Sequence, residues 1–301
     1  MTRRTSGILF VLGAAACWSL GGWLLKLTTA SPGTIACYRS AVAGVVLMGV
    51  VLVRRIKPAG ATRLLWLGLA YGATMFAFVI ANRTTTAAAA IALQYTAPVW
   101  VVVFGMLLMK EKPSRGQVPA FVLCGVGTVL FFAVGQSDPA GTASAFGNGV
   151  ALFSGLAFGA ALALTRWLRR VPSVYLAGVG NLVAFVVMLP AALAWDHPGR
   201  TFTSPELHRL IVPMRDVLLI LILGTVQTAL PYALFAEGVK RIEAYRASLV
   251  CLSEPVMNPL WVLLFIGEVP TPAMIVGVGL ILAGIATVGR RRPMAKLPPP
   301  D

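Results

Sequence analysis

The sequence contains few charged residues, which make up 12% of its 301 positions. A soluble domain carries about 25% charged residues, so this composition excludes an ordinary soluble protein. Hydrophobic residues make up 58% of the chain, and the mean hydropathy is +0.83. The composition therefore predicts an all-α integral membrane protein with most of its length in lipid.

Acidic residues are scarcer than basic ones, with 10 Asp and Glu against 25 Lys and Arg and a net charge of +15. Such an excess can indicate a nucleic-acid partner. Here the positive charges gather in short loops between apolar runs, which is typical of membrane proteins. We therefore expect no nucleic-acid partner. The expected partners are the lipid bilayer and a small-molecule substrate, and the chain is expected to be a monomer.

Residues that build metal centres, disulfides and common enzyme sites are few or dispersed. Both histidines, His197 and His208, fall in one polar stretch, and the chain has no C-x-x-C pair and no Walker loop. Ser253 and Glu254 are adjacent, so they point to different helix faces and do not form a nucleophile–base pair. Each cysteine lies inside an apolar run: Cys17, Cys37, Cys124 and Cys251. We predict no disulfide, no metal, no cofactor and no enzyme activity.

Ten apolar runs approach the length of about 20 residues that crosses a bilayer. They cover roughly 7–28, 33–53, 64–82, 86–109, 116–135, 146–166, 173–195, 216–238, 244–266 and 270–289. The longest polar connection is 196–215, where Ser204-Pro205-Glu206 is compatible either with the start of an interfacial helix or with an irregular loop.

The orientation in the membrane follows from the distribution of Lys and Arg. If the N-terminus is cytoplasmic, 19 of the 25 basic residues fall on the cytoplasmic side. An even number of spans then places both termini in the cytoplasm. The stretch 293–301 is expected to be a disordered cytoplasmic tail.

The two halves of the chain resemble each other. A shift of 157 residues places Pro98-Val99 on Pro255-Val256 and Glu111 on Glu268, and a shift of 140 aligns the more N-terminal parts. Five spans in each half give the halves, 1–138 and 139–292, opposite orientations in the membrane. Inverted repeats with interrupted helices are typical of transporters with a substrate site near the midplane.

These motifs resemble the EamA type of the drug/metabolite transporter superfamily. The matching residues are Pro98-Val99 followed by Lys110-Glu111, and Glu254-Pro255-Val256 followed by Gly267-Glu268. Within that family the chain is most similar to the YddG-type exporters of aromatic amino acids. The resemblance implies ten spans, a bacterial inner-membrane location, and export of small metabolites by alternating access through a central cavity.

The stretch 244–268 carries the strongest indication of a site, because Glu254 lies near its middle. A carboxylate at that depth costs roughly 2.5 kcal/mol or more unless it has a partner or faces a wet cavity. Helical spacing places Asn258 and Trp261 on the same face. The alternative is a structural kink in which Glu254 is protonated or is bonded to a neighbouring helix.

Other candidate residues follow from equivalent positions and from polar or aromatic side chains within spans. The predicted substrate-binding residues are Trp18, Phe76, Phe78, Gln94, Trp100, Phe158, Gln227, Tyr232, Glu254, Asn258 and Trp261, and the predicted helix-break or gating residues are Pro98 and Pro255. Each aromatic side chain could instead pack between helices or face lipid.

Three further charged residues lie inside or near the predicted spans. Arg39 could hold a carboxylate or lock helices by bonding carbonyls, Lys26 is expected to extend to the surface, and Glu237 is expected to pair with Lys240 or Arg241.

An aromatic and weakly polar chamber suits an amino acid with an aromatic or other apolar side chain. The alternatives are a carrier for drugs, purines or nucleotide sugars, and a channel.

Overall fold

The computed structural model describes residues 2–57, 63–110, 118–135, 144–168, 171–195, 214–242, 247 and 250–289, and this part of the chain is helical with no strand. The helices of the first half are α1 (Arg3–Ser19), α2 (Gly21–Leu27), α3 (Pro32–Val53), α4 (Arg63–Thr84), α5 (Ala87–Gln94), α6 (Ala97–Met109) and α7 (Val118–Gly135). Those of the second half are α8 (Ala145–Trp167), α9 (Ser173–Trp195), α10 (Met214–Ile222), η3 (Leu223–Ala229), α11 (Leu230–Gly238), α13 (Glu254–Ile266) and α14 (Pro272–Gly289).

Seven helical segments in the described residues are long and apolar enough to cross a membrane, and three shorter apolar helices accompany them. Large apolar side chains cover the outer faces of the bundle, such as Trp66 with 61% of its surface exposed and Leu107 with 70%. Exposed apolar surface of this extent suits lipid rather than water. The prediction of an all-α, multi-pass membrane protein is therefore confirmed. Residues 196–213 and 290–301 lie outside the described part, so neither the interfacial helix nor the tail is described.

Several predicted spans are interrupted helices. The span 7–28 consists of α1 and α2, which are separated at Leu20. The span 216–238 contains the π-helical segment η3 between α10 and α11. Pro98 and Pro255 both lie in the first turn of a helix, α6 and α13 respectively. A backbone N–H in the first turn has no partner within the helix, so a proline there costs no helical hydrogen bond.

The starts and ends of α6 and α13 have the same local geometry. The Thr96 hydroxyl donates to the Leu93 carbonyl at 2.7 Å, and the Ser253 hydroxyl donates to the Val250 carbonyl at 2.8 Å. Each helix ends at a residue in the left-handed conformation, Lys110 with φ 54° and Gly267 with φ 81°. Because a shift of 157 residues relates each of these pairs, the two helices share one sequence register.

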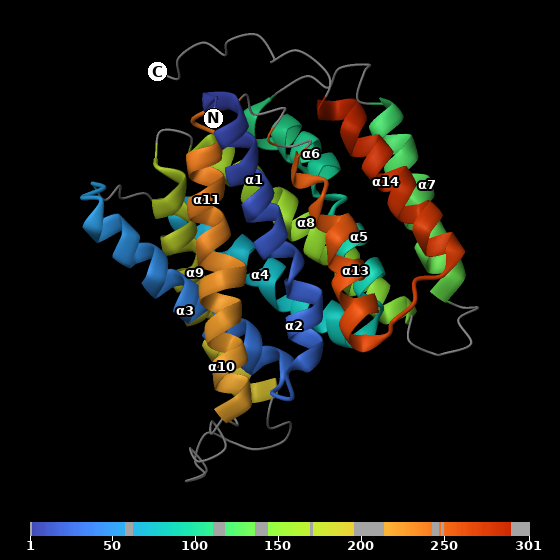
Figure 1. The fold of residues 1–301 in the computed structure, drawn as a ribbon, viewed down its shortest axis with the longest axis horizontal. Helices are drawn as coiled ribbons and strands as arrows, with labels where there is room; N and C mark the ends of the chain where they lie inside the picture. The colour runs from blue at the N-terminus through green and yellow to red at the C-terminus, as the bar shows by residue number, and fades with distance from the viewer. Residues whose placement is uncertain are drawn as a thin grey trace.

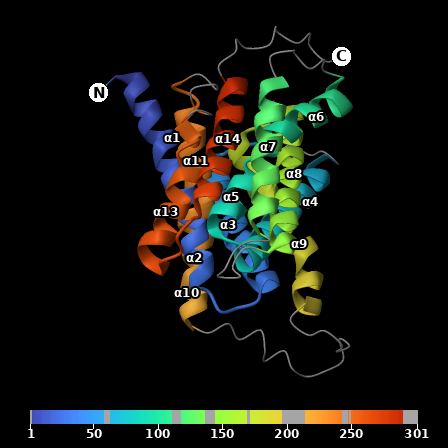
Figure 2. The ribbon, with the colours of Figure 1, turned by 90° about the vertical axis from the view of Figure 1, so that its right-hand side faces the viewer.

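The helices pack into one bundle in which the two halves of the chain interleave (Figure 1). α3 packs against α9, α4 against α8, and α1 against α11. α7 and α14 lie side by side in both views, at the right-hand edge of the bundle in Figure 1 and at its front in Figure 2. There the thiol of Cys124 lies 3.7 Å from the carbonyl oxygen of Ile281. The start of α1 and the end of α11 share one end of the bundle, and α2 ends at the opposite end (Figure 1).

Glycine residues lie at the closest contacts between these helices. The contact of Gly68 with α9 gives a test of the packing. A Cβ atom added to Gly68 on α4 would lie closer than 3.0 Å to Val183 on α9. We expect Gly68→Ala to lower the unfolding free energy by about 1–3 kcal/mol through overpacking. Gly49→Ala on α3 is the control, because nothing lies within 4 Å of its added Cβ. Helix propensity alone favours alanine there by about 1 kcal/mol. Equal melting temperatures for both variants would contradict this packing.

Candidate substrate site

Glu254 opens α13 and lies between Ser253 and Pro255, where the helix starts again after a turn. Its side chain is partly buried. The hydroxyl of Tyr95 donates to Oε2 of Glu254 at 2.6 Å, and the same hydroxyl lies 3.1 Å from the carbonyl oxygen of Cys251. Tyr95 ends α5, so this contact joins the interruption before α6 to the interruption before α13. The Tyr95–Glu254 pair therefore links the two broken helices directly.

Asn258 lies one turn further along α13 and is fully buried. Neither its side-chain nitrogen nor its side-chain oxygen has a hydrogen-bond partner in the structure. It packs against Gly22 of α2, where an added Cβ would collide with its amide. An unpaired buried amide costs about 1–3 kcal/mol. Because Gly22 covers the amide, a ligand can reach it only if α2 moves away.

Trp261 follows on the same face of α13 and contacts α1. Its indole N–H donates to the Ser19 hydroxyl at 2.8 Å, and Ser19 donates in turn to the Ala16 carbonyl at 2.7 Å. Trp261 thus borders the point at which α1 ends and α2 begins. The predicted shared face of Glu254, Asn258 and Trp261 contacts three helices, α5, α2 and α1.

Aromatic side chains from three helices meet beside this face. The ring of Tyr232 lies edge-on to Trp18, with centroids 5.6 Å apart, and 6.2 Å from the ring of Tyr71. Phe235 lies 5.8 Å from Trp18. We call these four residues the Trp18–Tyr232 cluster. Gln227 of η3 donates to the Trp18 carbonyl at 3.2 Å, so the π-helical segment supports the cluster.

The Trp18–Tyr232 cluster lies within electrostatic reach of two charged groups. Tyr232 lies within electrostatic range of the carboxylate of Glu254 and the guanidinium of Arg39, and it shares a hydrogen bond with Tyr71. Arg39 is 2% exposed, and its Nη2 contacts the thioether sulfur of Met75 on α4. One acid and one base therefore flank an aromatic wall inside the bundle.

The remaining predicted residues lie mainly against α8 or in the core. Gln94 donates to Ser154 at 2.8 Å, and Trp100 packs against Gly159 with its indole nitrogen buried and without a partner. Phe158 and Phe76 are partly buried, and Phe78 is buried beside Gly21. The structure thus brings together Trp18, Gln227, Tyr232, Glu254 and Trp261, while Gln94 and Trp100 face α8.

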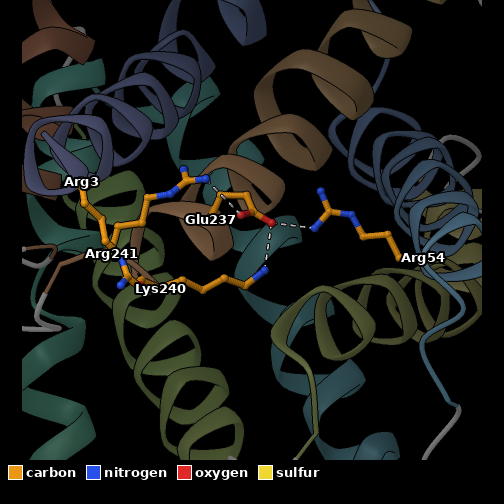
Figure 3. Close-up of polar contacts among 5 residues, drawn as sticks. All are labelled: Arg3, Arg54, Glu237, Lys240 and Arg241. Atoms are coloured by element: carbon orange, nitrogen blue, oxygen red, sulfur yellow. Dashed lines mark hydrogen bonds and ion pairs between the residues drawn. The ribbon is translucent and has the colours of Figure 1, made fainter. Parts of the chain in front are cut away.

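Charged residues cluster around Glu237 at one end of the bundle (Figure 3). Arg54, at the end of α3, lies 2.6 Å from Oε1 of Glu237 on α11, and Lys240 lies 2.9 Å from the same oxygen. Arg241 is 3.8 Å from Oε2. Arg3 of α1 donates to the Lys240 carbonyl at 3.3 Å. The expected pairing of Glu237 with Lys240 and Arg241 is present, and Arg54 extends it across to the first half of the chain.

The opposite end of the bundle carries a second charged contact. Lys26 at the end of α2 lies 2.6 Å from Oε2 of Glu268, and Oε1 of Glu268 accepts a bond from the Ala87 amide at 2.7 Å. Ala87 is the first residue of α5, where the free N–H groups of a helix favour an anion. The prediction that Lys26 extends to the surface is wrong, because both partners are mostly buried and bonded to each other.

Comparison with known proteins indicates a membrane transporter. The model of the EamA-like transporter family matches residues 5–133 and 145–290. The chain belongs to this family. The two matched regions lie in the two halves of the chain and together include most of its length.

Relatives of this EamA-like protein are also named as transporters. It is 27% identical to an uncharacterized transporter of Archaeoglobus fulgidus over 72% of each chain, and 25% identical to YwfM of Bacillus subtilis, over 93% of this chain and 92% of the relative. The inner membrane transporter YicL of Salmonella typhimurium is 27% identical over 72% of this chain and 70% of its own. A crystal structure at 19% identity superposes with a TM-score of 0.60 over 95% and 96% of the two chains, which supports the fold.

Proposed function

We propose that this EamA-family protein exports amino acids with aromatic or other apolar side chains. The observation that carries the proposal is Glu254, a carboxylate held by Tyr95 at the junction of two broken helices beside the Trp18–Tyr232 cluster. A carboxylate can bind an ammonium group, and aromatic walls suit an apolar side chain. The resemblance to YddG-type exporters supports the same substrate class.

The proposed mechanism is alternating access between two inverted five-helix halves, 1–138 and 139–292. The matching geometry of α6 and α13 supports this arrangement, since a shift of 157 residues relates their starts and ends. Cys124 and Ile281, which contact each other across α7 and α14, differ by the same 157 residues. Equivalent residues that meet in this way are expected near a two-fold axis.

The charged contacts at the two ends suit gates of such a carrier. The Arg54–Glu237 pair joins α3 to α11, and the Lys26–Glu268 pair joins α2 to the connection between α13 and α14. Both pairs therefore link the first half of the chain to the second. In the proposed cycle one pair separates while the other stays closed, which exposes the Trp18–Tyr232 cluster to one side at a time.

Organic cations are the second candidate class, because Glu254 and an aromatic wall would bind them as well. A thermal-shift screen of the detergent-purified protein separates the candidates. Its probes are L-phenylalanine, L-tryptophan, adenosine, a nucleotide sugar and tetraphenylphosphonium. A ligand present at 100 times its Kd stabilises the protein by about 2.7 kcal/mol. Stabilisation by the two amino acids supports the proposal, and stabilisation by the cation alone would overturn it.

We further propose a bacterial inner-membrane location with both termini in the cytoplasm, on the basis of the Lys and Arg distribution. Single cysteines at Ser204 and Ala295, in a variant whose four native cysteines are removed, test this orientation. An impermeant maleimide added to intact cells is expected to label position 204 only. Labelling of position 295 in cells that have not been lysed would contradict it.

A further inference from the structure

Arg39 is the most deeply buried basic residue in the described part of the chain, and it has no ion-pair partner there. The side chain is 2% exposed, and neither Nε nor Nη1 has a hydrogen-bond partner. The recorded contact of Nη2 is with the sulfur of Met75, a weak acceptor. A guanidinium keeps its charge in proteins, and a buried charge without a partner is strongly destabilising.

No acidic residue of the described chain neutralises Arg39. Four acidic residues lie in this part of the sequence, and three have other partners: Glu237 pairs with Arg54, Glu268 with Lys26, and Asp216 accepts bonds from Thr29 and Ala30. The fourth, Glu254, is bonded to Tyr95. Arg39 therefore has no counter-charge among the described residues, and an anionic group of a bound molecule would supply one.

The surroundings of Arg39 connect it to the proposed substrate site. η3 packs tightly against α3 at this level, because an added Cβ on Gly224 would lie 3.1 Å from the Arg39 carbonyl oxygen. π-helical segments of this kind occur frequently at functional sites. Tyr232 of the Trp18–Tyr232 cluster lies within electrostatic range of both Arg39 and Glu254.

We propose that Arg39 binds the carboxylate of the transported substrate. Glu254 holds the ammonium group in the proposed function, on which this inference rests, so the site would recognise both ends of a zwitterion. The guanidinium offers a planar pair of donors, which matches a carboxylate in a bidentate arrangement. Each planar pair of donors includes Nη2, so a carboxylate would replace the weak contact of Nη2 with Met75 and would take its second bond from the free Nε or Nη1.

The test compares three probes with the same phenyl ring on the full-length purified protein. L-Phenylalanine carries both charged groups, phenethylamine lacks the carboxylate, and 3-phenylpropanoate lacks the ammonium group. We expect Arg39→Gln to weaken phenylalanine and phenylpropanoate binding about 10- to 100-fold, the range for a hydrogen bond to a charged group. Phenethylamine binding is expected to change less than about threefold. Arg39→Lys is expected to recover part of the loss, since it restores the charge without the planar fork.

The control is Arg83→Gln, which removes an arginine that is already bonded to Thr28 and Ala30. This variant is expected to leave the preference among the three probes unchanged. The melting temperature without ligand gives a second readout. Arg39→Gln should match or exceed the wild type, because it removes an unpaired buried charge.

One result would overturn the inference alone, namely an equal preference for phenylalanine over phenethylamine in wild type and Arg39→Gln. If the melting temperature of Arg39→Gln is then also well below that of the wild type, Arg39 is a structural residue. If the wild type binds none of the three probes, the proposed function fails, and the inference fails with it.

Discussion

Glu254→Gln is expected to weaken the binding of phenylalanine and phenethylamine about 10- to 100-fold while the protein stays folded. The loss follows from removing the negative charge that faces the ammonium group. Folding should be retained, because the glutamine carbonyl can still accept the 2.6 Å bond from Tyr95. Phenylpropanoate, which has no ammonium group, should bind as it does to the wild type. The measurement is equilibrium binding of the three probes to wild type and variant.

Two other roles of Glu254 give different results. If Glu254 carries a coupling proton, the glutamine variant should bind all three probes normally but lose the dependence of transport on a pH gradient in inverted vesicles. If Glu254 only connects helices, neither binding nor pH dependence should change. Glu268→Gln is the matched control, since it makes the same chemical change at the end of the bundle where Lys26 is the partner. Its probe preference should remain that of the wild type.

Locking the Glu237 end of the bundle is expected to abolish transport almost completely. With cysteines at Arg54 and Glu237 in the variant without native cysteines, a short bifunctional methanethiosulfonate would join α3 to α11. The side chains of this pair meet at 2.6 Å, so a short linker can bridge them. If transport requires the two halves to separate here, cross-linking should lower the rate at least about tenfold, and dithiothreitol should restore it.

The control for this experiment places both cysteines on one segment, at Glu237 and Arg241. These residues are four apart in the chain and lie near the same end of the bundle, so a linker between them does not join the two halves. The cross-linked control should transport at the rate of its reduced form. Transport by the cross-linked Arg54/Glu237 variant at the reduced rate would remove this contact from the mechanism.

Depth in the membrane could be predicted from the sequence, whereas contacts between distant segments could not. Hydropathy placed Glu254 and Arg39 inside spans, and the structure buries both at least partly. The partner of Glu254 is Tyr95, 159 residues earlier, and no local pattern links the two positions. The sequence likewise predicts Lys26 at the surface, because no local pattern links it to its partner Glu268, 242 residues later.

Helix interruptions were predictable where proline marks them and hidden elsewhere. Pro98 and Pro255 indicated the starts of α6 and α13. The break at Leu20 has no proline, and it coincides with close packing that depends on other helices. A Cβ on Gly21, the next residue, would lie 2.9 Å from the Gln227 amide nitrogen. The interruption at Leu20 therefore depends on contacts between helices, which local sequence patterns do not predict.

Counterflow in proteoliposomes tests the proposed amino-acid carrier most directly. The liposomes contain the purified protein and unlabelled L-phenylalanine, and labelled L-phenylalanine is added outside. A carrier with alternating access is expected to take up label faster when the interior holds phenylalanine than when it is empty, and Glu254→Gln should abolish most of this acceleration. Uptake no faster than in protein-free liposomes, or equal uptake with and without internal phenylalanine, would contradict the account.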